Sequence, residues 1–211
     1  MAGPAELDAL DLAALLCSRV CHDLISPVGA IVNGMEVLEE TNDESTRTFA
    51  LDLIKKSANQ ASARLQFCRL AFGAAGSAGA EIDLGDTETV ARGLIDDDKI
   101  KLGWQLPRVL MPKNRVKLLL NLLLLAMQII PRGGTITAET VGEGDATGFR
   151  VTAKGLNARV PHTLSALESG EAPASVDAHA IQPHYTGLLA RACGLTIGVE
   201  PEGDGFVLTA R

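Results

Sequence analysis

Residues 21–31 read CHDLISPVGAI, which places a proline inside what otherwise reads as one long amphipathic helix. A proline in a helix interior costs about 3 kcal/mol, because it removes a backbone hydrogen bond and pushes its ring against the carbonyl four residues back. For Pro27 that carbonyl belongs to Asp23, the neighbour of His22. The sequence therefore predicts a bend in the helix beside a histidine and an acid.

Apolar residues on both sides of this stretch recur at the spacing of one helical face over about residues 6–40. The stretch TNDES (41–45) supplies turn and cap residues, and a second helix is expected to run to about Phe72. Both helices also carry apolar residues off the main stripe, so we expect two copies of this hairpin to form a four-helix bundle across a twofold axis. The alternative is that the rest of the chain covers them. The stripe of the first helix comprises Leu12, Leu16, Val20, Leu24, Val28, Ile31, Met35 and Leu38.

If Leu24 lies at the middle of this stripe, His22 lies about 160° away and points outward. An exposed, neutral imidazole is a good nucleophile, and Asp23 is placed to orient it or to hold its proton. A lone surface histidine is more often only a solvated side chain. The outer face around His22 is small or polar and would let another protein approach, and it consists of Arg19, Ser26, Gly29, Ala30 and Asn33.

The string HDLISPVGAI resembles the dimerisation and histidine phosphotransfer box of sensor histidine kinases. The match runs through His22, Asp23, Ser26, Pro27, Val28 and Ile31, and it departs at Ile25, where kinases often have a basic residue. The resemblance implies that His22 is a phospho-acceptor. Phosphoryl transfer also needs a metal to neutralise charge, and the sequence around His22 has neither a phosphate-binding loop nor a carboxylate pair. The partner is therefore expected to bring both.

The stretch GAAGSAGA (73–80) is small and flexible in composition and predicts a boundary between domains at 1–75 and 81–211. Beyond it, strands are grouped with helices that would lie on one side of them, and this pattern predicts a two-layer α/β sandwich in a chain of the α+β class. The expected helices lie near 86–95, 112–130 and 182–193, and the expected strands are KLGWQL (101–106), TITAETV (135–141), FRVTAKG (149–155), LTIGVE (195–200) and GFVLTA (205–210).

The segment VKLLLNLLLLAMQIIPRGGTITA (116–138) resembles the asparagine box of the kinase ATP-binding domain, with Asn121 as the first asparagine. The second asparagine is replaced by Leu125, which cannot bind magnesium. In the glycine-rich acidic box, Ala153 replaces the adenine-binding aspartate and Asn157 replaces a glycine. Only Gly187 is left of the phosphate loop. The resemblance thus implies a degenerate kinase-like domain that binds no ATP or other cofactor.

The whole pattern resembles the ChpT family of alphaproteobacterial histidine phosphotransferases. That resemblance implies a homodimer in which His22 accepts a phosphoryl group from the receiver domain of the hybrid kinase CckA and passes it to the response regulators CtrA and CpdR. Mg²⁺ would be bound by the partner's receiver domain. Two alternatives remain: an ATP-dependent histidine kinase with a divergent pocket, and a non-catalytic dimeric adaptor.

Net charge, apolar runs and cysteine content also limit the classes of partner and the cellular location that we expect. A net charge of −7 argues against nucleic acid, whose binding requires clustered Lys and Arg. The longest apolar run, 118–130, is shorter than the roughly 20 residues that span a bilayer, so no membrane segment is expected. The cysteines read as reduced thiols of a cytoplasmic protein. Cys17, Cys21 and His22 lie close in sequence, but core thiols are favoured over a metal site.

Overall fold

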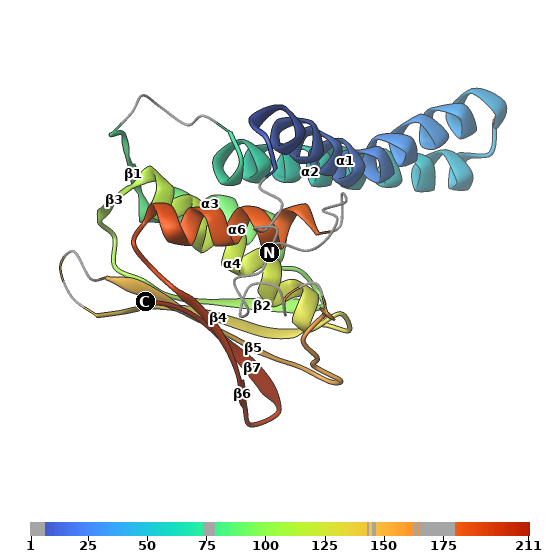
Figure 1. Cartoon of the computed structure of the whole chain (residues 1–211). Coiled ribbons are helices and arrows are strands. Elements are labelled where there is room, and N and C mark those ends of the chain that lie inside the picture. Colours follow the sequence, from blue (N-terminus) through green and yellow to red (C-terminus); the bar gives the residue numbers. More distant parts are fainter. Residues whose placement is uncertain (1–6, 74–78, 143, 145–146, 163, 165–179) are drawn as a thin grey trace.

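The computed structural model describes residues 7–73, 79–142, 144, 147–162, 164 and 180–211. Its first two helices, α1 (Ala9–Glu40) and α2 (Glu44–Ala71), form an antiparallel hairpin beside an α/β part (Figure 1). The end of the hairpin near residues 40–44 extends beyond that part. Most of the predicted linker, residues 74–78, lies outside the described residues.

Aspartate caps fix where the two hairpin helices begin. The Asp8 carboxylate accepts a hydrogen bond from the Asp11 backbone N–H, and the Asp43 carboxylate accepts one from the Thr46 N–H, each at 2.8 Å. The Thr46 hydroxyl also donates to Asp43 at 2.7 Å. These hydrogen bonds lower the pKa of the Asp43 carboxyl. The predicted turn at TNDES is therefore confirmed.

The strands form a small sheet and a large one. Strands β1 (Glu81–Asp83) and β3 (Leu110–Pro112) pair antiparallel, and neither was predicted from the sequence. The five-stranded sheet has the order β2-β4-β5-β7-β6, in which β2 and β4 are parallel and the other pairs are antiparallel. Its members are β2 (Ile100–Gln105), β4 (Gly134–Val141), β5 (Gly148–Lys154), β6 (Ile197–Glu202) and β7 (Gly205–Ala210).

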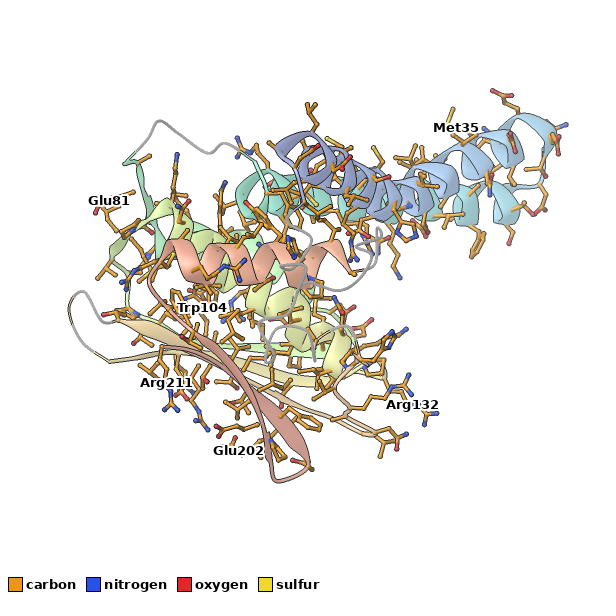
Figure 2. The ribbon with its side chains drawn as sticks, viewed as in Figure 1. Met35, Glu81, Trp104, Arg132, Glu202 and Arg211 are labelled. Atoms are coloured by element: carbon orange, nitrogen blue, oxygen red, sulfur yellow. The ribbon has the colours of Figure 1, made fainter. Side chains whose placement is uncertain are left out.

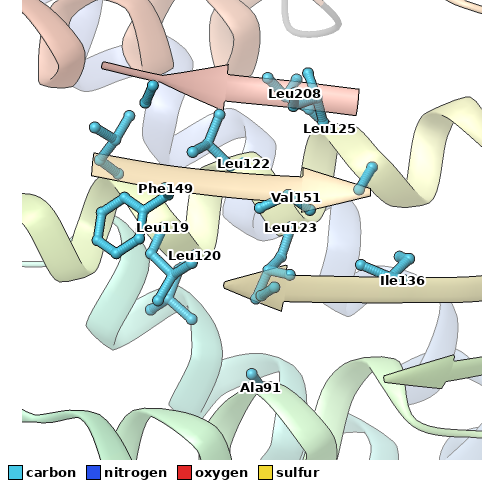
Figure 3. Packing of buried hydrophobic residues seen from close by; sticks show 14 of the residues in the cluster. Ala91, Leu119, Leu120, Leu122, Leu123, Leu125, Ile136, Phe149, Val151 and Leu208 are labelled. Atoms are coloured by element: carbon cyan, nitrogen blue, oxygen red, sulfur yellow. The ribbon is translucent and has the colours of Figure 1, made fainter. Parts of the chain in front are cut away.

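Among the described residues, three helices cover one face of the large sheet: α3 (Leu84–Ile95), α4 (Lys113–Ile129) and α6 (Ile181–Ala192). The middle helix, α4, is apolar nearly all round, because the sheet lies on one side and α6 and the hairpin lie on the other. Figure 3 shows Leu119, Leu122 and Leu123 of α4 beside Phe149 and Val151 of β5. The predicted α+β class, with a helical hairpin and a two-layer sandwich, is confirmed.

The predicted apolar stripe of α1 has the wrong phase. Pro27 and Gly34 are the buried residues of the helix, whereas Val28 and Met35 are 48% and 47% exposed. Gly34 is buried because α2 passes so close that a Cβ there would lie 2.6 Å from Cγ1 of Ile54. The helix has two apolar sides, only one of which contacts α2, and the predicted stripe fell between them.

Candidate functional site: an exposed histidine on the hairpin

His22 lies on α1, five residues before Pro27, with 70% of its side chain exposed. Ser26 and Asn33 are also exposed on this part of the helix, and nothing lies within 4 Å of a Cβ placed on Gly29. Because helix positions separated by three, four, seven or eleven residues share a face, these residues form one surface with His22. A partner protein could approach the imidazole closely over this surface.

The structure places two other predicted members of that surface differently. Arg19 points toward Asp23, and its side chain is only 21% exposed. Ala30 is half-buried rather than outward-facing. The correction follows from the phase of α1: the side that packs on α2 lies closer to these two residues than a stripe centred on Leu24 implied.

Asp23 brings His22 and both hairpin helices together. Its Oδ1 lies 3.4 Å from Nδ1 of His22, and its Oδ2 accepts a hydrogen bond from Nε of Arg19 at 3.1 Å. Its backbone carbonyl, which Pro27 leaves without a helical donor, accepts one from Nη1 of Arg64 in α2 at 3.3 Å. The sequence predicted Asp23 as the orienting acid but gave no indication of Arg64, which is 41 residues away.

A cavity of about 300 Å³ lies behind this cluster, where the hairpin meets α3 and α4. Arg19, Asp23 and Arg64 line it from the hairpin, and Leu94 and Met127 line it from the α/β part. Cys68 is also in the wall, and burial, reinforced by the negative charge of Asp23, raises the pKa of its thiol to about 11. The Cys68 thiol is therefore held neutral near physiological pH.

In the segment that resembles a kinase asparagine box, Asn121 forms hydrogen bonds with other parts of the chain. Asn121 is fully buried, and its Nδ2 donates to the carbonyl of Ala71 at the end of α2 (3.2 Å) and to that of Lys117 (2.9 Å). Nε2 of Gln182 in α6 donates to the Asn121 carbonyl at 3.0 Å. Asn121 thus joins α2, α4 and α6, a role that sequence reasoning missed.

The positions that depart from the kinase pattern in this box and in the glycine-rich acidic box are also part of the fold. Leu125 and Ala153 are fully buried in the core. Asn157 has a φ of 59°, the left-handed conformation that glycine adopts most readily and asparagine tolerates. Asn157 therefore has the backbone conformation that a glycine would adopt at this position. The predicted phosphate-loop remnant, Gly187, lies inside α6.

Comparison with known proteins agrees with this architecture. Residues 84–205 match the family model described as the histidine phosphotransferase C-terminal domain. The protein phosphotransferase ChpT of Brucella abortus (strain 2308) is 50% identical over the full length of both chains. The chain belongs to the histidine phosphotransferase family.

The phosphotransferase also matches a solved structure of a bacterial phosphotransferase with a TM-score of 0.90 and 48% identity over all of both chains. Histidine kinase domains are among its other structural neighbours, such as that of a blue-light activated kinase from Erythrobacter litoralis, with a TM-score of 0.47 and 14% identity over 88% of this chain and 92% of that one. The family model and the full-length relative confirm the predicted membership of the histidine phosphotransferase family.

Two features of the described residues of the phosphotransferase concern metal ions and membranes. Among the residues that the structure describes, no group of three or more His, Cys, Asp or Glu side chains is arranged to hold a metal ion. Helix α1 is long and apolar enough to cross a membrane by length and composition, as are buried core helices of soluble proteins and N-terminal signal sequences. Only 6% of its most apolar window is buried within the chain.

Proposed function

We propose that His22 is the phospho-acceptor through which this phosphotransferase relays a phosphoryl group between the receiver domain of a CckA-like hybrid kinase and response regulators resembling CtrA and CpdR. The observation that carries the proposal is the exposed imidazole of His22 with its Nδ1 turned to the Asp23 carboxylate. A ring that keeps its proton on Nδ1 has its lone pair on Nε2, where a partner can reach it.

The transfer is a displacement at phosphorus in each direction. Nε2 of His22 forms the N–P bond as the P–O bond to the receiver's aspartate breaks, and the electron pair of that bond leaves with the aspartate. The proton on Nδ1 stays on the ring, and Asp23 stabilises the positive charge that the ring acquires. In the onward step the carboxylate of a second receiver attacks phosphorus, and the electron pair of the N–P bond returns to Nε2.

The partner would supply the metal. We assign to the receiver domain the Mg²⁺ that neutralises the phosphoryl oxygens, because no group of three or more His, Cys, Asp or Glu side chains among the described residues is arranged to hold a metal ion. The docking surface would consist of His22, Ser26, Gly29 and Asn33, with Arg19 and Ala30 at its border. Its small side chains favour close approach of the receiver's phosphorylated aspartate.

A second copy of the chain would complete the hairpin as a four-helix bundle. On α1, Ile25, Val28, Val32 and Met35 recur every three or four residues and are 47–69% exposed. Figure 2 shows Met35 on the side of the hairpin turned away from the α/β part. Helix α2 adds Leu51 and Leu65, which are 54% and 52% exposed. In symmetric four-helix bundles, an apolar stripe of this kind is usually buried against the same stripe of the second copy.

His22→Ala tests the proposal. The purified variant, incubated with a phosphorylated receiver domain, should acquire no label, while its melting temperature stays within about 2 °C of the parent because an exposed ring contributes little to packing. His162→Ala, which removes another exposed imidazole, should label like the parent. Retained labelling of His22→Ala would overturn the assignment. If the parent protein acquires no label and His22→Ala still supports signalling, the adaptor alternative is favoured.

A further inference from the structure

We propose that Arg64 of α2 is a positioning residue for His22, an inference that rests on the proposed function. Pro27 has no N–H, so the carbonyl of Asp23 loses its donor within α1. Nη1 of Arg64 replaces that donor from the facing helix at 3.3 Å. The cost of the proline is thereby offset by a contact that connects α2 to the backbone next to His22.

Arg64 and Arg19 hold the same aspartate at different points. Arg19 binds the Asp23 carboxylate from within α1, at 3.1 Å, and Arg64 binds its backbone carbonyl from α2. A guanidinium is always charged and its donors are fixed in one plane, so both contacts restrict direction as well as distance. With its backbone and side chain both held, Asp23 has little freedom to turn its Oδ1 away from His22.

The surroundings of Arg64 indicate a specific role for its guanidinium and not only packing at the surface. The guanidinium lines the cavity behind Asp23, and its Nε is buried without a hydrogen-bond partner among the described residues. Leaving a buried donor unsatisfied is costly, and such groups in a folded protein call for an explanation. The hydrogen bond from Nη1 to the Asp23 carbonyl explains the unsatisfied Nε. To make this bond, the Arg64 side chain extends from α2 toward α1, and its Nε then lies in the interface between the two helices.

The consequence for transfer concerns the tautomer of His22. With Asp23 fixed 3.4 Å from Nδ1, the neutral ring keeps its proton on Nδ1, and Nε2 is left as the nucleophile. If the Asp23 backbone shifts, the carboxylate moves with it, and the ring loses the group that selects this tautomer. Small displacements of this kind reduce rates because the reacting atoms must be aligned.

The first experiment compares Arg64→Ala with Arg69→Ala, which removes the same charge from an exposed position of the same helix. Transfer from a phosphorylated receiver should fall roughly 10- to 100-fold in Arg64→Ala and stay near the parent rate in Arg69→Ala. Long-range ¹H–¹⁵N spectra of the His22 ring should show a smaller population protonated on Nδ1 in Arg64→Ala alone. A purely structural role for Arg64 would leave that population unchanged in the folded fraction and would overturn the proposal.

The second experiment is a double-mutant cycle with Pro27→Ala. An alanine at position 27 restores an N–H that can satisfy the Asp23 carbonyl, so Arg64→Ala should slow transfer less in this background than in the parent. Equal losses in both backgrounds would show that Arg64 does not act through that carbonyl. If Arg64→Ala behaves like the parent while His22→Ala abolishes labelling, the positioning role fails and the proposed function stands; if His22→Ala still labels, the proposed function fails.

Discussion

Asp23 shows how a single residue next to His22 depends on several others. Its carboxylate contacts His22 and Arg19, its carbonyl contacts Arg64, and the carbonyl is available only because Pro27 lacks an N–H. Removing any one partner changes what holds the other atoms of Asp23. For this reason we expect substitutions around Asp23 to be non-additive in phosphoryl transfer.

Cys68 offers a test of the cavity wall at the scale of one side chain. Burial and the nearby charge of Asp23 raise its thiol pKa to about 11, so roughly one thiol in a thousand is ionised at pH 8. Iodoacetamide should therefore modify Cys68 slowly in the folded protein and rapidly in urea, as measured by peptide mass spectrometry. Comparable modification rates of Cys68 in both conditions would contradict the burial of this wall.

The same pKa predicts the direction of a pH effect on stability. The folded state favours the neutral thiol of Cys68 relative to the ordinary pKa of 9.0, so this contribution is fully present below about pH 9. It is lost as the pH rises toward 11, because the unfolded chain ionises first.

At the scale of elements, sequence reasoning located the helices and the long strands within a few residues. It succeeded for α4 and for β4 to β7 because a long apolar helix and alternating strands between glycine turns give strong periodic signals. It missed β1 and β3, which have three residues each and too short a pattern to detect. On α1 the periodicity established the helix but not its phase, because the exposed Val28 and Met35 are as apolar as the residues that pack on α2.

The two glycines inside α1 provide a matched test of this corrected phase. Gly29 has open space around a placed Cβ, so Gly29→Ala should stabilise the helix by about 1 kcal/mol. Gly34→Ala gains the same propensity, but its Cβ would lie 2.6 Å from Ile54 Cγ1, and overpacking of this kind costs about 1–3 kcal/mol. Thermal unfolding should therefore show a higher melting temperature for Gly29→Ala and a lower one for Gly34→Ala. The opposite order would mean that α2 packs elsewhere on α1.

At the scale of the whole molecule, the sequence predicted both parts of the chain but not their connection. Arg64 contacts a residue 41 positions away, and Gln182 contacts one 61 positions away. Such long-range pairs leave no periodic pattern in the sequence. Arginine and glutamine are also common on protein surfaces, so the residue type alone does not indicate the contact. The resemblance to a kinase box identified Asn121, yet it could not show that the side chain supports the end of α2.

The proposed dimer is tested by placing a charge in the exposed stripe of α1. Val32→Glu should shift the protein from dimer to monomer in sedimentation experiments, because an unpaired carboxylate would be buried between the copies. Asn33→Glu, one residue along on the surface around His22, should leave the mass unchanged. If Val32→Glu sediments like the parent, the stripe does not join two copies.

Substitution of Asn121 distinguishes a structural scaffold from a nucleotide-binding site. Asn121 already donates to Ala71 and Lys117 and accepts from Gln182, so its amide is committed to holding the hairpin on the α/β part. Asn121→Ala leaves buried partners unsatisfied at about 1–3 kcal/mol each, and the melting temperature should fall by several degrees.

Millimolar Mg²⁺ and ATP should leave the melting temperature of the parent unchanged, and the fall caused by Asn121→Ala should be the same with and without them. Magnesium sulfate at equal ionic strength serves as the control for salt. A ligand that binds the folded state raises its stability by an amount set by the ratio of its concentration to its dissociation constant. A saturable rise in the parent that is lost in Asn121→Ala would therefore show that Asn121 still serves a nucleotide, and the scaffold interpretation would be wrong.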